Sequence, residues 1–244
     1  HHCPYYHKLV NIEKIKIFQG NEYTAFGTAL HSVCEDLLTE EVSISKPELF
    51  NQKFRDEIKK LNSEELNKKL VISMFEQGGK LSEQVLPSLE KYFDDCEVFM
   101  AEEKLYEPIS GFDDYLFKGY VDLILKEGDN YHIIDWKTCS WGWDNRKRSD
   151  KMIIYQLVLY KHFFCQKYGI NPKMVHTHFG LLKRTSKKDI VEVFKVTSGP
   201  KRVENALELL YKAIKTIKSG VHIKNKLSCT SGYGCEFYKT KHCN

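Results

Sequence analysis

One segment of the 244-residue chain constrains the fold most: GYVDLILKEGDNYHIIDWKT, residues 119–138. Apolar residues flank the turn around Gly128-Asp129 on both sides, which predicts two antiparallel strands joined as a hairpin. Side chains alternate along a strand, so Asp135 and Lys137 point to the same face of the second strand. If the hairpin closes symmetrically about Gly128-Asp129, Asp122 of the first strand lies directly opposite Asp135.

The Cβ atoms of such a pair are ~4.5–5.5 Å apart, and two carboxylates on such neighbours repel each other unless a cation lies between them. Mg²⁺ takes few protein carboxylates and completes its shell with water and phosphate oxygens, so the pair suits a phosphate-processing site. Lys137 could then position the attacking water or stabilise the transition state. The alternative is a solvated hairpin face on which Lys137 makes a surface ion pair with Asp122 and Asp135.

The rest of the chain predicts an α/β fold with a central mixed β-sheet flanked by helices. Between its first helix and first strand, a charged helical pattern predicts a helical insertion at about 40–95, broken by Gly78-Gly79 and Pro87. We expect one domain over residues 1–244, with a Cys-rich tail at about 221–244. The expected strands are 97–105, 116–125, 131–138, 174–182 and 189–196, and the other expected helices are 29–38, 150–167 and 201–218.

Composition narrows the class of protein without giving its function. The chain is 42% hydrophobic and 29% charged, and no apolar run reaches the ~18–20 residues of a membrane span. We therefore expect no membrane partner, and a net charge of +4 predicts a localised basic cleft. A chain of this length does not need disulfides, so we expect its eight cysteines to be reduced and the protein to be cytoplasmic. It begins at His1 and not at Met, so we expect residues upstream.

Four motifs in fixed order, FGTALHSVCE, GYVDLIL, IIDWKT and YQLVLY, resemble the RecB-type branch of the PD-(D/E)XK nuclease superfamily. The match covers most of residues 26–160, and the combined order is specific although each motif alone is weak. The resemblance implies a restriction-endonuclease-like core. It also implies Mg²⁺- or Mn²⁺-dependent cleavage of DNA, by an exonuclease of recombination, repair or replication. The compact form is similar to phage or CRISPR-associated members, and a phage protein would act in the host cell.

The resemblance also implies roles for particular residues. His31, Asp122 and Asp135 would bind the metal together with the backbone carbonyl of Trp136, and Lys137 would be the catalytic lysine. Two further acidic candidates are Glu35, one turn after His31, and Glu103 on the preceding strand. Gln156 and Tyr160 lie one helical turn apart and would face the cleft, where they touch the DNA or support the site.

Some members of this branch hold an iron–sulfur cluster with one cysteine upstream of the His motif and three near the C-terminus. Cys3, Cys229, Cys235 and Cys243 have that order and could hold a [4Fe–4S] cluster. Their Cys-x5-Cys-x7-Cys spacing departs from the family's Cys-x2-Cys-x5-Cys. The departure leaves two alternatives open, which are Zn²⁺, with His242 as a substitute ligand, and no metal at all.

A basic loop directly after the catalytic strand is the best candidate for contact with the DNA backbone. Arg146, Lys147 and Arg148 would contact phosphates, which gives affinity without sequence preference. Trp141 could stack on an unpaired base, as could Trp143. The alternative is an ordinary solvated loop with both tryptophans in the core.

Two rival functions remain from the sequence. One is a non-catalytic nucleic-acid-binding or assembly module on the same fold, against which the intact Asp122, Asp135 and Lys137 argue. The other is a metal-dependent phosphoesterase that acts on a small substrate. The sequence has no GxxxxGK[ST] phosphate loop and no helicase motif, so a helicase, recombinase or single-strand-binding protein would be a separate partner.

Overall fold

The structure is a computed structural model that describes residues 3–40, 42–230 and 234–243; His1 and His2 lie outside these ranges. The chain divides into two compact units. The larger comprises residues 21–203, and the smaller comprises residues 1–20 together with 204–244. The expected single domain over 1–244 stays a prediction.

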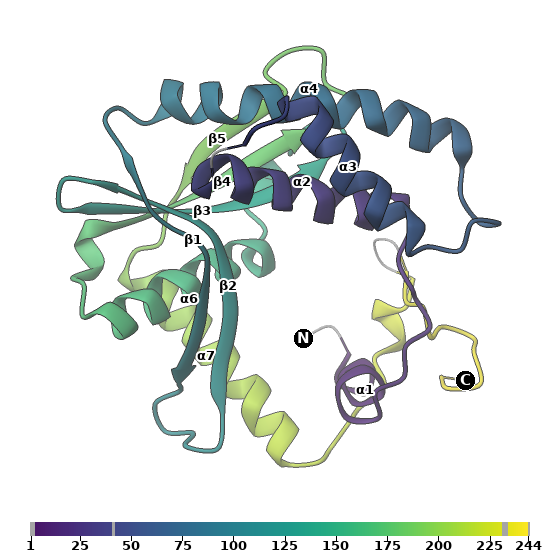
Figure 1. The fold of residues 1–244 in the computed structure, drawn as a ribbon. Coiled ribbons are helices and arrows are strands. Elements are labelled where there is room, and N and C mark those ends of the chain that lie inside the picture. The colour runs from purple at the N-terminus through teal and green to yellow at the C-terminus, as the bar shows by residue number, and fades with distance from the viewer. Residues whose placement is uncertain (1–2, 41, 231–233, 244) are drawn as a thin grey trace. The chain divides into compact units, whose positions relative to one another are not determined.

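A five-stranded mixed sheet forms the centre of the larger unit (Figure 1). The strands lie side by side in sequence order, and neighbouring strands are antiparallel except for the parallel pair β3–β4. The predicted α/β class with a central mixed sheet is confirmed. The strands are β1 (Glu97–Pro108), β2 (Leu116–Glu127), β3 (Asn130–Cys139), β4 (Val175–Lys183) and β5 (Val191–Val196).

The β2–β3 hairpin has the register that the sequence predicts. Its strands pair from Glu127↔Asn130 to Leu123↔Ile134, and Gly128 has a φ of +56° in the two-residue loop. Pairing with β3 ends at Leu123, but β2 stays paired with β1 as far as Pro108↔Leu116. The two strands therefore leave the sheet as a two-stranded extension, residues 103–108 and 116–121, which we call the β1–β2 arm (Figure 1).

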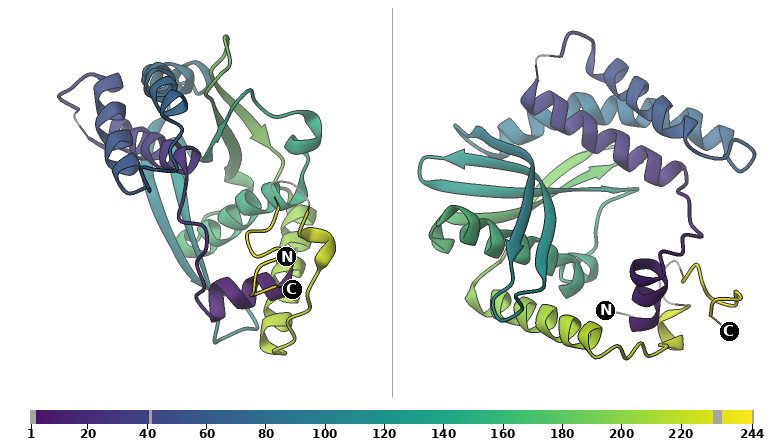
Figure 2. Two further views of the ribbon diagram at one scale, coloured as in Figure 1. Left: turned by 90° about the vertical axis from the view of Figure 1, so that its right-hand side faces the viewer. Right: turned by 60° about the horizontal axis from the view of Figure 1, so that its bottom comes forward.

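Helices cover both faces of this sheet (Figures 1 and 2). On one face, buried residues of three helices pack with Leu123, Ile134 and Trp136 of the sheet in one hydrophobic core. On the other face, α6 is the crossover between the parallel strands β3 and β4. The helices of the first face are α2 (Glu22–Thr39), α3 (Lys46–Lys59) and α4 (Lys68–Tyr92), and the crossover contains α5 (Asn145–Arg148), α6 (Lys151–Tyr168) and the 3₁₀-helix η2 (Pro172–Met174).

The helical stretch before β1 differs from the sequence prediction in one respect. α4 is a single helix of 25 residues that continues through Gly78-Gly79 and Pro87, where we expected breaks. The ring of Phe50 in α3 lies so close to Gly78 that a Cβ there would be 2.1 Å from it. Close packing between α3 and α4 explains this glycine, and the tertiary contacts outweigh its low helix propensity.

The smaller unit contains the two ends of the chain. Its helical segments are α1 (Pro4–His7), η1 (Lys8–Ile12), η3 (Lys226–Ser228) and the part of α7 (Pro200–Lys218) that follows Val203. The Glu236 carboxylate joins the two ends, because it accepts hydrogen bonds from the Tyr6 hydroxyl at 3.0 Å and the Phe18 amide at 2.8 Å. In the described part of the chain, no helix combines the length and the apolar character needed to cross a bilayer.

Candidate active site

Asp122 lies where β2 and β3 separate, one residue beyond their last pair, Leu123↔Ile134. Its Oδ2 accepts a hydrogen bond of 2.6 Å from the backbone amide of Trp136. A side chain therefore bridges the strands at the point where backbone pairing stops. We call this point, where β2 and β3 separate, the fork. It places Asp122 beside Asp135, as the hairpin register predicts.

Asp135 is only 2% exposed, and its Oδ2 forms an ion pair with the Lys137 ammonium. The same oxygen has no hydrogen bond of acceptable geometry. Burial raises the pKa of Asp135 to about 6; Lys137 opposes this shift and the charge of Asp122 adds to it. A buried carboxylate that lacks hydrogen bonds favours a bound cation.

His31 reaches the fork from α2. The buried face of this helix, which includes Phe26, Leu30 and Val33, packs in the core, so His31 and Glu35 face the strands. His31 Nδ1 is 3.5 Å from Asp122 Oδ1. Burial lowers the pKa of His31, but the hydrogen bond with Asp122 and the nearby carboxylates outweigh burial, so the net shift is upward.

An open pocket of about 470 Å³ lies between α2 and the strands β1 and β2. Three carboxylates line it, those of Glu35, Glu102 and Asp122, together with His31. Burial raises the pKa of Glu102, and the charges of Asp122 and Glu35 raise it further. The complete lining is Gly27, Thr28, His31, Ser32, Glu35, Glu102, Tyr120 and Asp122.

The acidic residue of β1 at this pocket is Glu102, not the predicted Glu103. Glu103 accepts a hydrogen bond of 2.7 Å from Tyr168 and pairs with Lys167, both at the end of α6. Glu102 has a left-handed backbone with φ +49° and lies opposite Asp122, between the pairs Ala101↔Leu123 and Glu103↔Val121. Its place opposite Asp122 comes from the β1–β2 register, which the sequence alone does not give.

Gln156 and Tyr160 lie together on α6, as their spacing predicts, and the Gln156 amide donates a 2.9 Å hydrogen bond to the Tyr160 hydroxyl. Tyr160 is 8% exposed. Burial raises its pKa, and the charges of Asp135 and Asp122 add to this shift. Tyr160 therefore lies near both carboxylates, underneath the site.

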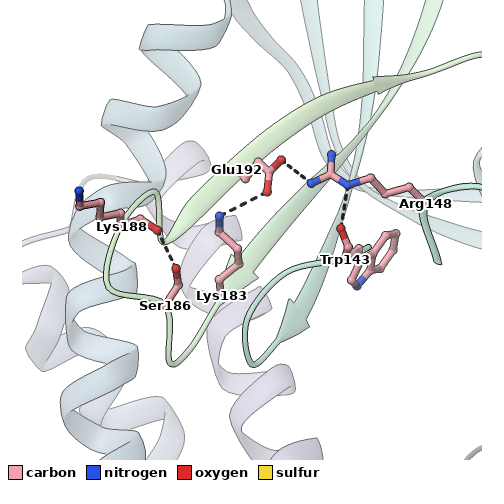
Figure 3. A network of polar contacts seen from close by, with 6 residues as sticks. All are labelled: Trp143, Arg148, Lys183, Ser186, Lys188 and Glu192. Atoms are coloured by element: carbon pink, nitrogen blue, oxygen red, sulfur yellow. Dashed lines mark hydrogen bonds and ion pairs between the residues drawn. The ribbon is translucent and has the colours of Figure 1, made fainter. Parts of the chain in front are cut away.

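In the basic loop after β3, some side chains hold the structure together and others are exposed. Figure 3 shows the structural contacts of Arg148. Arg148 donates hydrogen bonds to Glu192 Oε1 at 2.6 Å and to the Trp143 carbonyl at 2.9 Å, and Trp143 is buried. Arg148 is therefore a structural residue. Arg146 and Lys147 are exposed, and Trp141 is 75% exposed, so these three remain the candidates for DNA contact.

The four cysteines of the predicted cluster all lie in the smaller unit, and the structure brings them together. Burial raises the pKa of Cys229, and nearby Cys235, Cys243 and Cys3 raise it further. The backbone amide of Cys235 also donates to the Cys229 carbonyl at 2.9 Å. Three thiolates on one Zn²⁺ would be about 3.8 Å apart, yet the only three ligand atoms within 4.8 Å of one another in the described residues belong to another group.

That other group is Cys96, Glu127 and His132, at the turn end of the β2–β3 hairpin. His132 Nε2 is 3.2 Å from Glu127 Oε2, and His132 Nδ1 is 3.1 Å from Nε2 of His178 on β4. A thiol, a carboxylate and an imidazole are together a donor set that could hold a metal ion. The sequence pattern does not single out this group, although His132 follows a hairpin turn that Glu127 precedes.

The family model of the PD-(D/E)XK nuclease superfamily matches residues 1–240 of this chain. The chain belongs to the PD-(D/E)XK nuclease superfamily. The predicted family is confirmed, and membership supports a nuclease, a hydrolase that acts on phosphodiester bonds. Nucleases of this family typically use divalent metals. A search of the curated proteins found no match.

A solved structure shares this fold. The structure of a candidate exonuclease from Eubacterium rectale superposes with a TM-score of 0.61 at 12% identity, over 93% of this chain and 79% of that one. At this identity the likeness shows the fold alone. The structure of the protein SSO0001 is 15% identical over 81% of this chain and 88% of that one, but its TM-score of 0.36 is too low to support an argument.

The residues at the fork fit a divalent ion. Their donors are carboxylate oxygens and one imidazole, which suit Mg²⁺ or Mn²⁺, and Asp135 is a buried carboxylate without a hydrogen bond. One oxygen of each aspartate already has a partner, because Asp122 Oδ2 accepts from the Trp136 amide and Asp135 Oδ2 pairs with Lys137. Lys137 is therefore an internal competitor for any ion that binds at Asp135.

Proposed function

We propose that this protein is a divalent-metal-dependent deoxyribonuclease that hydrolyses DNA phosphodiester bonds. We further propose that it acts as an exonuclease in recombination, repair or replication. The observation that carries the proposal is the buried Asp135 carboxylate, whose Oδ2 forms an ion pair with Lys137 and has no hydrogen bond, with Asp122 beside it. Lys137 supplies one positive charge to this pair of carboxylates, so a divalent cation would further relieve their repulsion.

Each residue at the fork has a distinct task in this proposal. Asp122, Asp135, His31 and the Trp136 carbonyl would hold the ion, which when bound supplies an acidified water and positive charge opposite the phosphate. The hydrogen bond from the Trp136 amide fixes the direction of the Asp122 carboxylate. The water oxygen forms the new bond to phosphorus, and the bond from phosphorus to the leaving sugar oxygen breaks.

Lys137 changes its partner in the course of this reaction. Its ammonium neutralises Asp135 when no other cation is present. With a divalent ion held at that carboxylate, the ammonium would be free to orient the water or to donate a hydrogen bond to a phosphate oxygen as negative charge develops. Glu35 and Glu102, which line the same pocket, can accept protons or hold a further water.

We also propose that Cys3, Cys229, Cys235 and Cys243 hold a [4Fe–4S] cluster in the smaller unit. The proximity of Cys229 to the other three supports a four-thiolate site, and a [4Fe–4S] cluster takes four cysteine thiolates. Anaerobically purified protein should be brown, with iron and sulfide near four per chain. Cys235→Ser should lose the colour, and Cys139→Ser should keep it.

The test of the nuclease is cleavage of end-labelled linear and closed circular DNA with Mg²⁺ or Mn²⁺, and with EDTA. We expect metal-dependent loss of the linear DNA only, which Asp135→Asn abolishes. Asp129→Asn, an exposed substitution in the turn of the same hairpin, is the matched control and should cleave normally. Cleavage of the circle would make the enzyme an endonuclease.

If folded wild-type protein cuts neither DNA, the non-catalytic binding module on the same fold becomes the preferred function. Hydrolysis of small phosphodiesters without salt-sensitive DNA binding would instead favour a small-substrate phosphoesterase. Any helicase, recombinase or single-strand-binding partner would be a separate protein, which co-purification from the source cell can identify.

A further inference from the structure

The two faces of the β1–β2 arm differ sharply in character. Leu105 and Gly119 on one face are buried, and on the other face the alternating residues are exposed. Tyr106 is 55% exposed and Tyr120 is 43% exposed, which is unusual for two large aromatic side chains that are neighbours on a strand pair. The exposed face of the arm is formed by Lys104, Tyr106, Lys118 and Tyr120.

These four side chains form a chequerboard of rings and ammonium groups. Lys104 is paired directly with Tyr120, and Tyr106 with Lys118, so each ring faces a lysine across the strands. Along each strand the lysine also lies over the next ring. The distance from Lys104 Nζ to the Tyr106 ring centroid is 5.4 Å, and from Lys118 Nζ to the Tyr120 ring centroid it is 5.5 Å. The two tyrosines are diagonal neighbours, with Cβ atoms about 7–8 Å apart.

The opposite face of the arm gives this chequerboard a firm support. Phe117 stacks on Phe163 of α6 with ring centroids 4.1 Å apart and an interplanar angle of 9°. Gly119 lies so close to Tyr160 of α6 that a Cβ there would be 2.6 Å from the Tyr160 ring. The arm is therefore packed against α6 and is not a free hairpin.

The chequerboard is continuous with the active site. Tyr120 is part of its face and also lines the pocket with Asp122, Glu102 and His31. Asp122 follows Tyr120 by two residues on the same strand, a step of about 6.8 Å. A chain of nucleotides on the exposed face would therefore reach the carboxylates at the fork.

We propose that the exposed face of the β1–β2 arm binds single-stranded DNA and guides it to the fork, an inference that rests on the proposed nuclease function. Tyrosine rings stack on any unpaired base, and adjacent ammonium groups contact the phosphates, which together give sequence-independent binding of single strands. The bases of a duplex cannot stack on the tyrosine rings, because they already stack on each other. The arm therefore makes the enzyme prefer single strands or frayed ends.

Charge supports DNA as the occupant of this face. The carboxylates of the pocket need a cation before they tolerate a phosphate, whereas Lys104 and Lys118 are cations outside it. A polyanion would thus be attracted first to the arm. A protein partner would not require the strict alternation of rings and ammonium groups.

The test measures binding of a fluorescein-labelled 20-nucleotide single strand and of its duplex by anisotropy, in EDTA so that no DNA is cut. Tyr106→Ser should weaken single-strand binding by about tenfold or more, whereas Tyr106→Phe should keep it, because the ring still stacks. Neither variant should change binding of the duplex. Lys104→Gln with Lys118→Gln should reduce the salt slope, log Kd against log salt, by about 1.4.

The matched control is Lys68→Gln with Lys69→Gln, two exposed lysines at the start of α4 that give the same change in net charge. It should bind like wild type. Thermal unfolding of every variant excludes loss of fold as the cause. Single-strand affinity that is unchanged in Tyr106→Ser and in the double lysine variant overturns the proposal, even if the enzyme cuts DNA. Arm-dependent binding by a wild-type protein that never cuts DNA would sink the nuclease function and leave the arm as a binding site.

Discussion

The β2–β3 hairpin has a group of potential metal ligands at each end, and the two groups differ in chemistry. At the fork, Asp122 and Asp135 offer oxygens and His31 one nitrogen, next to an open pocket. At the turn end, the ligands are the Cys96 thiol, the Glu127 carboxylate and the His132 imidazole. Oxygen ligands suit Mg²⁺ and Mn²⁺, whereas thiol and imidazole ligands suit Zn²⁺ and similar ions.

The surroundings of the two groups differ as well. The fork is lined by further carboxylates and is open to a substrate. At the turn end, the Phe93 ring packs on His132 with centroids 5.0 Å apart, and Phe93 also packs on His178 at 5.1 Å. One hairpin therefore separates an open, carboxylate-lined end suited to chemistry on phosphate from an end where an aromatic ring packs on the histidines.

The largest effect is expected for Asp135→Asn, which should lower cleavage by about 10³-fold or more. The same substitution should stabilise the metal-free protein at pH 8. The pKa of Asp135 is raised from 3.8 to about 6 in the folded state, so its contribution to stability is present below pH ~4 and lost as the pH rises through about 6. The free energy of unfolding in EDTA should rise by up to about 3 kcal/mol, and the difference should vanish at pH 4.

Lys137→Gln should lower cleavage by about 10²–10³-fold without weakening metal binding. The lysine competes with a metal ion for Asp135, so its removal should leave Mn²⁺ affinity equal or tighter, as measured by calorimetry. Weaker Mn²⁺ binding in this variant would show that the ion pair organises the site and does not compete with the ion.

As the pH falls, cleavage at the fork should be lost before the protein unfolds. At subsaturating Mg²⁺, cleavage should fall about tenfold for each pH unit below about 6, because protonation of Asp135 removes a ligand. Saturating Mg²⁺ should move the midpoint to lower pH. A midpoint that does not respond to Mg²⁺ would assign the titration to another group.

Glu102→Gln and Glu103→Gln test the assignment of the acidic residue on β1. Glu102→Gln should lower cleavage by about tenfold, because Glu102 lines the pocket. Glu103→Gln should leave cleavage near wild type and cost about 1 kcal/mol of stability through its contacts with α6. The reverse result would restore the sequence-based choice of Glu103.

The smallest effect on cleavage is expected at the turn end of the hairpin. Cys96→Ser should leave Mg²⁺-dependent cleavage unchanged, because this group does not line the pocket. It should remove the thiolate charge-transfer absorbance that Co²⁺ gives on binding to Cys96. A cluster on the terminal cysteines absorbs in the same region, so the comparison uses difference spectra against Cys96→Ser.

The sequence predicts the fork well, because a symmetric two-residue turn dictates the register and hence places Asp122 near Asp135. It fails at Glu102, where a left-handed backbone in mid-strand leaves no mark in the hydrophobic pattern. It also fails at α4, since only tertiary contact with Phe50 shows why Gly78 does not end the helix. The turn-end group cannot be recognised from the sequence pattern, because Cys96, Glu127 and His132 come from three different strand ends.

Trp136 follows Asp135 on β3, and its ring covers Gly180 of β4 so closely that a Cβ there would be 2.2 Å away. Gly180 is the partner of Trp136 in the parallel β3–β4 pair. The Trp136 indole fits against β4 because Gly180 has no Cβ, and this packing fixes the position of β3 and of its Asp135 relative to β4. Gly180→Ala would push on the same residue whose amide orients Asp122, and a substitution far from the carboxylates in sequence would misalign the catalytic centre.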